Sequence, residues 1–170
     1  MATINGRLGL TGTVVIEGTA LRWNITSPTP ANFTYGSSTM IPLVGDWNGD
    51  GIEGIGAYEP IAFPRFHLRQ TATGGAADVI CPYGISGDVP ISWYDSSSKD
   101  GIGVIRGTKV YLDKNLSCGD AEINTTTDTT KCYSPIIKQC TYTPPTSNTL
   151  IYVAIAAAGL AVIYMATRKK

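Results

Sequence analysis

The chain has 170 residues, which is enough for about one domain. Its 13 basic and 13 acidic side chains balance, so no overall charge attracts nucleic acid or acidic membranes. Only 15% of the residues are charged, whereas Gly, Thr, Ser and Pro are abundant. Because this composition disfavours long helices in water and favours short strands with tight turns, we expect a mainly β protein built on a small antiparallel domain.

Residues 1–40 are expected to form an N-terminal β segment. Two strand-length runs, 13–17 and 20–25, are separated by Gly18 and Thr19, and Pro28 and Pro30 end the pattern. A signal peptide is not expected, because Arg7 is the one early charge and no apolar run here exceeds three residues. The pieces "MATINGR", "TVVIEGT" and "ITS" resemble the openings of phage tail-tube-like structural proteins.

Residues 41–114 contain the densest strand and turn signals and a degenerate internal repeat. The stretch "GIGAYEPIAFPRFHL" from Gly54 aligns with "GIGVIRGTKVYL" from Gly101, and "VGDWNGDGIE" faces "ISWYDSSSKD" upstream. Pro42 and Pro90 open the two copies, which lie about 47 residues apart, the size of a four-stranded propeller blade. The sequence therefore predicts one to one-and-a-half propeller-blade-like repeats.

This region resembles the FG-GAP-type repeats of integrin-like β-propellers. The resemblance rests on "GDWNGDGIEGIGAYEP", "FHLRQTATGGAADVICPYGISGDVP" and "DGIGVIRG", in that order. Full propellers of the family need several blades, and this chain supplies at most one complete unit and part of another. The resemblance implies either that neighbouring subunits complete the blades or that the unit belongs to a small β domain.

The loop after residue 45 has the spacing of a calcium loop. Asp46, Asn48 and Asp50 occupy its first, third and fifth positions, Gly51 allows the sharp turn, and Ile52 offers a backbone carbonyl. An acid at the ninth position is missing, so any calcium site is weak, on the order of millimolar affinity. The alternative is that the three polar side chains cap their own backbone in Asx-type turns. In the second copy Lys99 stands where a ligand would be, which predicts an empty site there.

Residues 115–149 are rich in Thr, Ser and Pro and are expected to form a long stalk or an irregular wrap. The chain has four cysteines, which permit three complete pairings, and no C-x-x-C spacing that would suggest structural zinc. We expect one disulfide among Cys118, Cys132 and Cys140 in an oxidising compartment. Free buried thiols are the alternative.

Residues 150–167 read "LIYVAIAAAGLAVIYMAT", without one charged side chain. As a helix, eighteen residues span about 27 Å, close to the ~30 Å hydrocarbon core of a bilayer. Tyrosines near both ends and a basic tail at 168–170 are typical of membrane interfaces. We therefore expect a single C-terminal transmembrane helix, with a buried core helix as the alternative. The anchor residues are Leu150, Tyr152, Gly159, Tyr164, Arg168, Lys169 and Lys170.

No pattern for catalysis stands out. His67 is the one imidazole, lies mid-strand between Phe66 and Leu68, and is expected to be a surface or packed residue. The sequence thus predicts a non-enzymatic, membrane-anchored structural or attachment protein without a cofactor. Its expected place is the membrane or capsid of a virion, where it links the bilayer to coat subunits.

The alternatives are a cell-surface FG-GAP-type adhesion module in the cell envelope and a membrane-tethered hydrolase. Expected partners are the lipid bilayer, coat subunits or a surface receptor, and a second helix, but no nucleic acid. Ala154, Ala158 and Gly159 belong to a small-residue helix surface suited to self-association.

Overall fold

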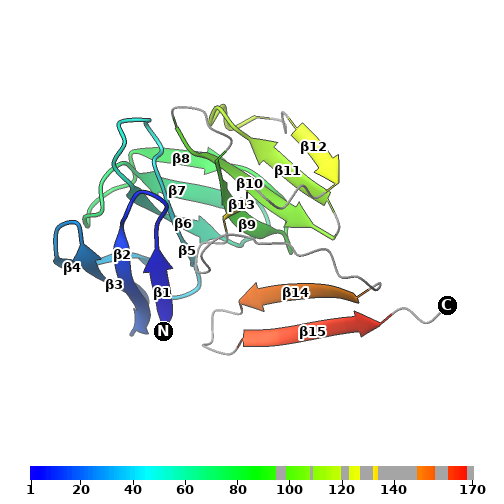
Figure 1. Ribbon diagram of the computed structural model, residues 1–170, viewed down its shortest axis with the longest axis horizontal. Helices are drawn as coiled ribbons and strands as arrows, with labels where there is room; N and C mark the ends of the chain where they lie inside the picture. The colour runs from blue at the N-terminus through cyan, green and yellow to red at the C-terminus, as the bar shows by residue number, and fades with distance from the viewer. Residues whose placement is uncertain are drawn as a thin grey trace.

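The computed structural model describes residues 1–94, 99–107, 109–119, 123–126, 132–133, 149–155 and 161–167, with side chains up to residue 119. These residues contain strands and no helix, which confirms the mainly β class (Figure 1). All strand pairs are antiparallel. The first sheet has the order β1 (Ala2–Asn5), β2 (Thr11–Glu17), β3 (Ala20–Ser27), β4 (Ala31–Ser37).

Two further sheets follow along the chain. The second sheet has the order β5 (Ile41–Gly45), β6 (Gly54–Glu59), β7 (Arg65–Arg69), β8 (Val79–Pro82). The third sheet has the order β12 (Ile123–Thr126), β11 (Lys109–Asp113), β10 (Gly101–Arg106), β9 (Val89–Trp93), β13 (Cys132–Tyr133). β12 and β13 lie within 115–149, so the third sheet extends into the segment expected to be a stalk.

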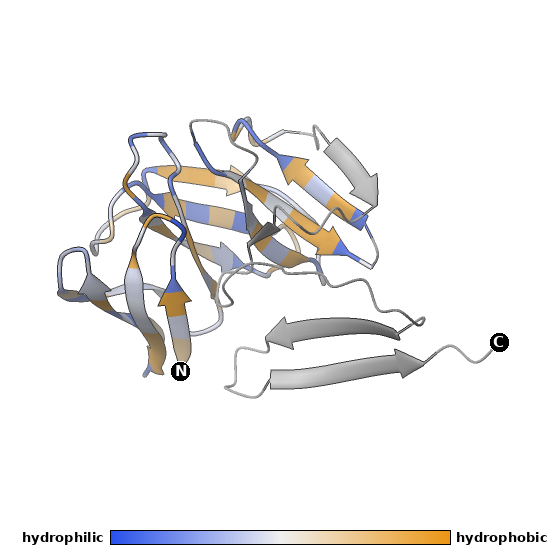
Figure 2. Ribbon diagram, viewed as in Figure 1, coloured by the Kyte–Doolittle hydropathy of each residue, from blue (hydrophilic) through white to orange (hydrophobic). Residues whose placement is uncertain are grey.

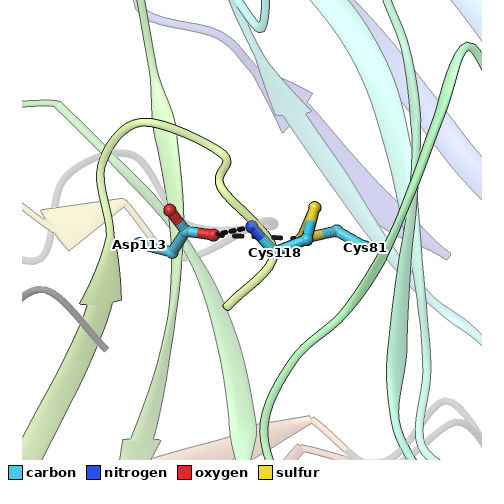
Figure 3. Close-up of side chains that lie close together, drawn as sticks. All are labelled: Cys81, Asp113 and Cys118. Carbon is cyan, nitrogen blue, oxygen red and sulfur yellow. Dashed lines mark hydrogen bonds between the residues drawn. A yellow bond between two sulfur atoms is a disulfide. The ribbon is translucent and has the colours of Figure 1, made fainter. Parts of the chain in front are cut away.

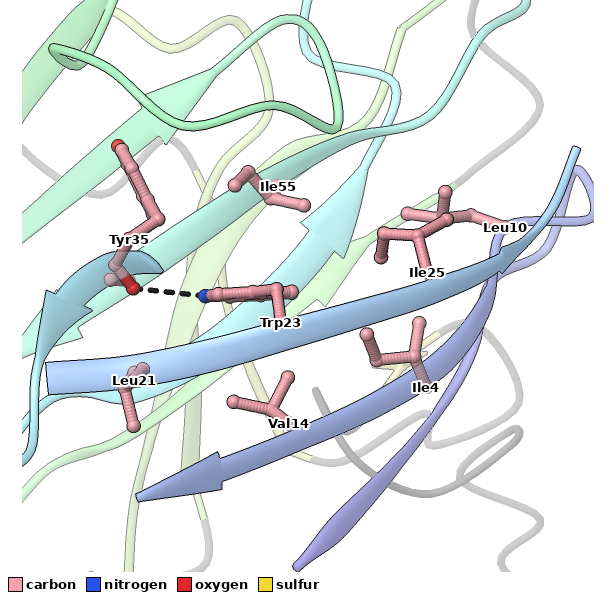
Figure 4. Packing of buried hydrophobic residues seen from close by; sticks show 9 residues of the cluster. Ile4, Leu10, Val14, Leu21, Trp23, Ile25, Tyr35 and Ile55 are labelled. Atoms are coloured by element: carbon pink, nitrogen blue, oxygen red, sulfur yellow. Dashed lines mark hydrogen bonds between the residues drawn. The ribbon is translucent and has the colours of Figure 1, made fainter. Parts of the chain in front are cut away.

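The first sheet buries one face. Along β3, Leu21, Trp23 and Ile25 are buried and the residues between them are half-buried, the alternation of a strand with one covered face. Trp23 is fully buried, and its indole N–H donates to the carbonyl of Tyr35 at 2.9 Å (Figure 4). Ile55 of β6 packs into the same cluster. The first sheet therefore covers one face of the second.

The second sheet is buried on both faces. Ile55 and Ala57 of β6 face the first sheet. Tyr58 points to the opposite face of β6, where it belongs to a cluster with Phe66 of β7 and Ile102 of β10 in the third sheet. Figure 2 shows hydrophobic and hydrophilic residues alternating along β7, as expected for a strand whose two faces differ. The three sheets are thus stacked in chain order, with the second in the middle.

The two repeat copies have the same strand pairing. Gly56 of β6 lies opposite Leu43 and Leu68, and Gly103 of β10 lies opposite Ile91 and Leu112. A Cβ atom at Gly103 would lie 2.7 Å from Leu112 Cδ2, and one at Gly56 would lie 3.0 Å from Leu68 Cδ2. The glycines thus make room for the leucine of the next strand in both sheets.

The C-terminal segment contains β14 (Thr149–Ile155) and β15 (Ala161–Thr167), which pair with each other and, within the described residues, with no other strand. Among the described residues no helix is long and apolar enough to cross a bilayer. Residues 156–160, with Gly159, and the basic tail at 168–170 lie outside the described residues. A transmembrane helix over 150–167 stays a prediction.

Candidate functional site

The three stacked sheets form what we call the body. Several of its buried polar groups converge where the loops between the first and second strands of the sheets meet. These loops are residues 6–10, 46–53 and 94–100. We call their contact region the junction and define it by Arg7, Leu10, Asp46, Glu53 and Asp100. The last two residues are equivalent in the repeat, because each immediately precedes the glycine that begins the second strand of its sheet.

Glu53 connects the second sheet to the first. Its side chain is buried, and its Oε2 accepts the backbone N–H of Leu10 at 3.0 Å. The loop backbone at Gly6 passes so close that a Cβ there would overlap the Glu53 carboxylate. A side chain at position 6 would therefore have to displace the Glu53 carboxylate from the Leu10 N–H.

Asp100 makes the corresponding connection between the third sheet and the second. Its Oδ2 accepts the N–H of Asp46 at 2.8 Å, and its own N–H donates to the Asp46 carbonyl at 2.7 Å. Its Oδ1 accepts from Arg7 Nη2 at 3.0 Å, and the Arg7 guanidinium lies 3.8 Å from the centre of the Tyr94 ring. All three sheets thus contribute to one hydrogen-bonded network.

Burial dominates the electrostatics of Asp100. Removal from water raises the pKa of this carboxyl above its ordinary value, while the Asp46 N–H and the Arg7 guanidinium act in the opposite direction. The buried ion pair with Arg7 is 20% exposed on the arginine side and 4% on the aspartate side. Such a pair fixes geometry more than it adds stability.

The predicted calcium loop uses its oxygens on its own backbone. Asp46 Oδ1 accepts the N–H of Gly49 at 2.7 Å, and its Oδ2 accepts that of Gly51 at 2.9 Å. Asp50 Oδ1 accepts the N–H of Ile52 at 2.8 Å, and Asn48 Nδ2 donates to Asp50 Oδ2 at 2.9 Å. This is the arrangement expected of the Asx-type alternative. A calcium ion would have to replace these N–H groups, and its binding here stays a prediction.

The counterpart loop of the third sheet differs from the second-sheet loop at Lys99. Residues 95–98 lie outside the described residues, but Lys99 Nζ donates to the carbonyl of Asn115 at 2.7 Å. The lysine therefore holds the chain after β11.

The structure pairs Cys118 with Cys81, so Cys118 does not take part in the expected disulfide with Cys132 or Cys140 (Figure 3). Cys132 and Cys140 are nearer to Cys118 in sequence, but the stacking of the second and third sheets brings β8, which carries Cys81, to the loop after β11. The side chain of Cys132 and all of Cys140 lie outside the described parts of the chain, so a bond between these two stays a prediction.

Asp113 shapes the loop that carries Cys118. Its Oδ2 accepts the N–H of Cys118 at 2.7 Å and its Oδ1 accepts that of Ser117 at 2.9 Å. Three possible metal-ligand atoms lie within 4.8 Å of one another here, one each from Cys81, Asp113 and Cys118. This spacing is compatible with a metal site. Since metal binding needs thiolates and these sulfurs are bonded to each other, the group is a disulfide with its supporting carboxylate.

His67 behaves as a packed strand residue. Its Nε2 lies 3.1 Å from Glu59 Oε2 across β6 and β7, and both side chains are partly exposed. No described group near this pair has the geometry of a nucleophile oriented by a base.

Sequence reasoning missed Arg7, Glu53 and Asp100 as members of one site. A usable signal was present, since "EGIG" and "DGIG" put an acid in the same place of both repeat copies. Apart from Arg7, the partners of these acids are backbone N–H groups in other loops. Every residue except proline has such a group, so the sequence does not indicate which one is bound. A comparison of the chain with family models, curated proteins and solved structures found no match.

Proposed function

We propose that this protein is a non-enzymatic structural or attachment protein, held at a membrane by residues 150–167. In the setting we favour it is a virion component that links a membrane to the protein coat through its β body. A cell-surface adhesion module is the alternative, and the blade-like repeat of the second and third sheets supports that setting equally.

The observation that carries the proposal is that the buried carboxylates accept hydrogen bonds from the backbone of loops. Each buried acidic side chain of the described body accepts at least one backbone N–H, and these residues are Asp46, Glu53, Asp88, Asp100 and Asp113. Acids committed in this way hold loops in place. They favour a rigid body made for contact over one made for turnover, and the tethered hydrolase is therefore the weaker candidate.

The apolar segment supports the membrane part of the proposal. A two-stranded sheet is marginally stable in water and leaves two unpaired edges. In hydrocarbon each unpaired backbone group costs several kcal/mol, whereas a helix satisfies all of them within the segment. We infer that residues 150–167 become one helix when lipid is present, with the basic tail at the surface of the bilayer.

Flotation with liposomes tests this proposal. The full chain should rise with the vesicles through a density gradient and remain bound in alkaline carbonate. The double variant Ala157→Arg/Ala158→Arg should stay at the bottom, because each arginine near a helix centre costs about 3 kcal/mol of insertion.

Ile52→Arg is the matched control, since Ile52 is 59% exposed on the body and far from the segment in sequence. This variant should float like the original chain. If the chain stays dissolved as a monomer and does not bind the vesicles, the membrane part of the proposal is refuted. Recovery of the native protein in purified particles would favour the virion setting, and recovery in cell envelopes would favour the adhesion module.

A further inference from the structure

A cavity of about 390 Å³ opens between the second and third sheets, away from the junction. Its walls include Phe63, Pro82, Tyr83, Gly84, Arg106 and Tyr111. A volume near 400 Å³ is within the range of small-molecule sites, which combine apolar and aromatic walls with a few polar groups. The wall residues have this mixture.

Hydrogen bonds to Asp88 fix the orientation of the Arg106 guanidinium in this cavity. Its Nε and Nη2 donate to the two carboxylate oxygens of Asp88, both at 2.8 Å, and its guanidinium lies 4.6 Å from the centre of the Tyr111 ring. Asp88 is anchored in turn by the N–H of Ile85 at 2.8 Å. Asp88 uses one edge of the planar guanidinium, and the Tyr111 side chain is a second neighbour that interacts with Arg106. The N–H groups that Asp88 does not use are those of Nη1 and the second N–H of Nη2, which point in parallel from the other edge.

The charge at the site selects against a strongly anionic ligand. The Asp88 side chain is 1% exposed and the Arg106 side chain 38%, so the arginine is the member of this neutral pair that a ligand meets. Two parallel donors without a net charge suit a pair of neighbouring neutral acceptors, such as the hydroxyl oxygens of a vicinal diol.

Phe63 gives the site an apolar platform. Its side chain is 80% exposed, the most exposed aromatic ring in the described part of the chain, although a ring of this size normally gains from burial. Gly84 has a φ of +96° on the cavity wall, where a Cβ would lie 3.1 Å from Asp88 Oδ2. A side chain at Gly84 would therefore press on the carboxylate that holds Arg106, and the glycine keeps this carboxylate in place.

We propose that this cavity binds one neutral hexopyranose ring of a glycan, with the C–H face of the sugar on Phe63 and two neighbouring hydroxyls accepting hydrogen bonds from Arg106. The inference gives the contact function proposed above a ligand class and rests on that function.

The test uses the full chain in micelles of a detergent without a sugar headgroup. Methyl glycosides of glucose, galactose and mannose are added, with glucuronic acid as the anionic arm, and saturation-transfer NMR follows binding. At least one methyl glycoside should bind saturably with a Kd on the order of millimolar, as expected for a ligand of this size.

Phe63→Ala should weaken binding about tenfold through loss of the aromatic contact, and Arg106→Lys should do the same because an ammonium cannot present two fixed donors. Ile16→Ala, an exposed apolar position on the first sheet, is the matched control and should leave the Kd unchanged.

Absence of saturable transfer to all three glycosides would overturn the inference, as would binding of glucuronic acid alone or equal binding by the Phe63 variant. Binding in micelles does not depend on insertion into a bilayer. A negative sugar result with normal flotation therefore refutes the ligand and leaves the membrane-anchored function standing, whereas failed flotation refutes the latter.

Discussion

Single side chains, or their absence, decide how the loops of the junction fit together. Gly6 leaves room for the Glu53 carboxylate, and that carboxylate satisfies the N–H of Leu10. Elsewhere in the core the Tyr58 hydroxyl is buried without a hydrogen-bond partner among the described residues. The first feature stabilises the body and the second costs stability, so opposite effects are expected from removing them.

Gly6→Ala should destabilise the body by about 1–3 kcal/mol, because the new methyl group overlaps the Glu53 carboxylate and displaces it from the Leu10 N–H. The measurement is urea unfolding of the full chain followed by tryptophan fluorescence. Gly74→Ala is the control, since the nearest atom to a Cβ there lies at 3.4 Å. Equal unfolding midpoints for the two variants would contradict the role of Gly6.

Tyr58→Phe should raise stability by about 1 kcal/mol at neutral pH, because it removes an unsatisfied buried hydroxyl and keeps the ring. Burial raises the pKa of Tyr58 from 10.0 to about 12. Since the folded pKa is the higher one, the unfolded chain ionises first. The original chain keeps its full stability below pH 10 and loses stability as pH rises toward 12, whereas the Phe variant is spared this loss.

Alkaline unfolding followed by tyrosinate absorbance measures this effect. The Phe variant should unfold at higher pH than the original chain, and part of the transition should persist, because burial also raises the pKa of Tyr35 to about 12. If the pH midpoint of alkaline unfolding is the same in both chains, ionisation of Tyr58 does not contribute to the unfolding.

At the scale of elements, the residue before the second strand of each sheet has a repeated role. In the second and third sheets it is a buried acid that accepts an N–H from the loop of the preceding sheet. In the first sheet the same place is taken by Leu10, which is also buried but donates its N–H to Glu53. The sheets are therefore joined in one direction along the chain.

Asp100→Asn tests this joint through its pH dependence. Burial raises the folded pKa of Asp100 above the ordinary value of 3.8, so its contribution to stability is complete below that value and is lost as pH rises through the folded pKa. The asparagine variant lacks this contribution. The stability of the original chain relative to the variant should therefore increase as the solution is made more acidic from neutral pH.

Urea unfolding of both chains at a series of pH values gives this difference directly. Glu17→Gln is a suitable control, because the Glu17 side chain is 65% exposed on the first sheet. If the difference in free energy of unfolding between Asp100→Asn and the original chain does not vary with pH, the raised pKa of Asp100 is refuted.

At the scale of the whole molecule, the Cys81–Cys118 bond connects the second sheet to the loop that follows β11 of the third. The bonded residues are 37 apart in sequence, and closing a loop of that size removes freedom from the unfolded chain. The bond thus acts on the same pair of sheets as Asp100, because Cys81 and Cys118 belong to the apolar cluster between the second and third sheets.

Cys118→Ser, or reduction of the original chain, should lower the free energy of unfolding by about 2–4 kcal/mol. The measurement is thermal unfolding in the presence and absence of a reductant. The serine variant should respond to reductant less than the original chain does, and any remaining response would report the predicted Cys132–Cys140 bond. An equal response of the two chains would contradict a stabilising role of the Cys81–Cys118 bond.

Local pattern alone determined the strand-rich class, the pairing of Gly54 with Gly101 as repeat positions, and the self-capping turn at residues 46–52 as one of two alternatives. These features depend on neighbours along the chain, where side-chain alternation and turn chemistry act over a few residues. Only the tertiary structure decided that Cys81 is the partner of Cys118 and that Arg7, Glu53 and Asp100 belong to one network. Those contacts join separate sheets, and stacking is governed by which faces bury apolar surface together, a property that no short stretch of sequence contains.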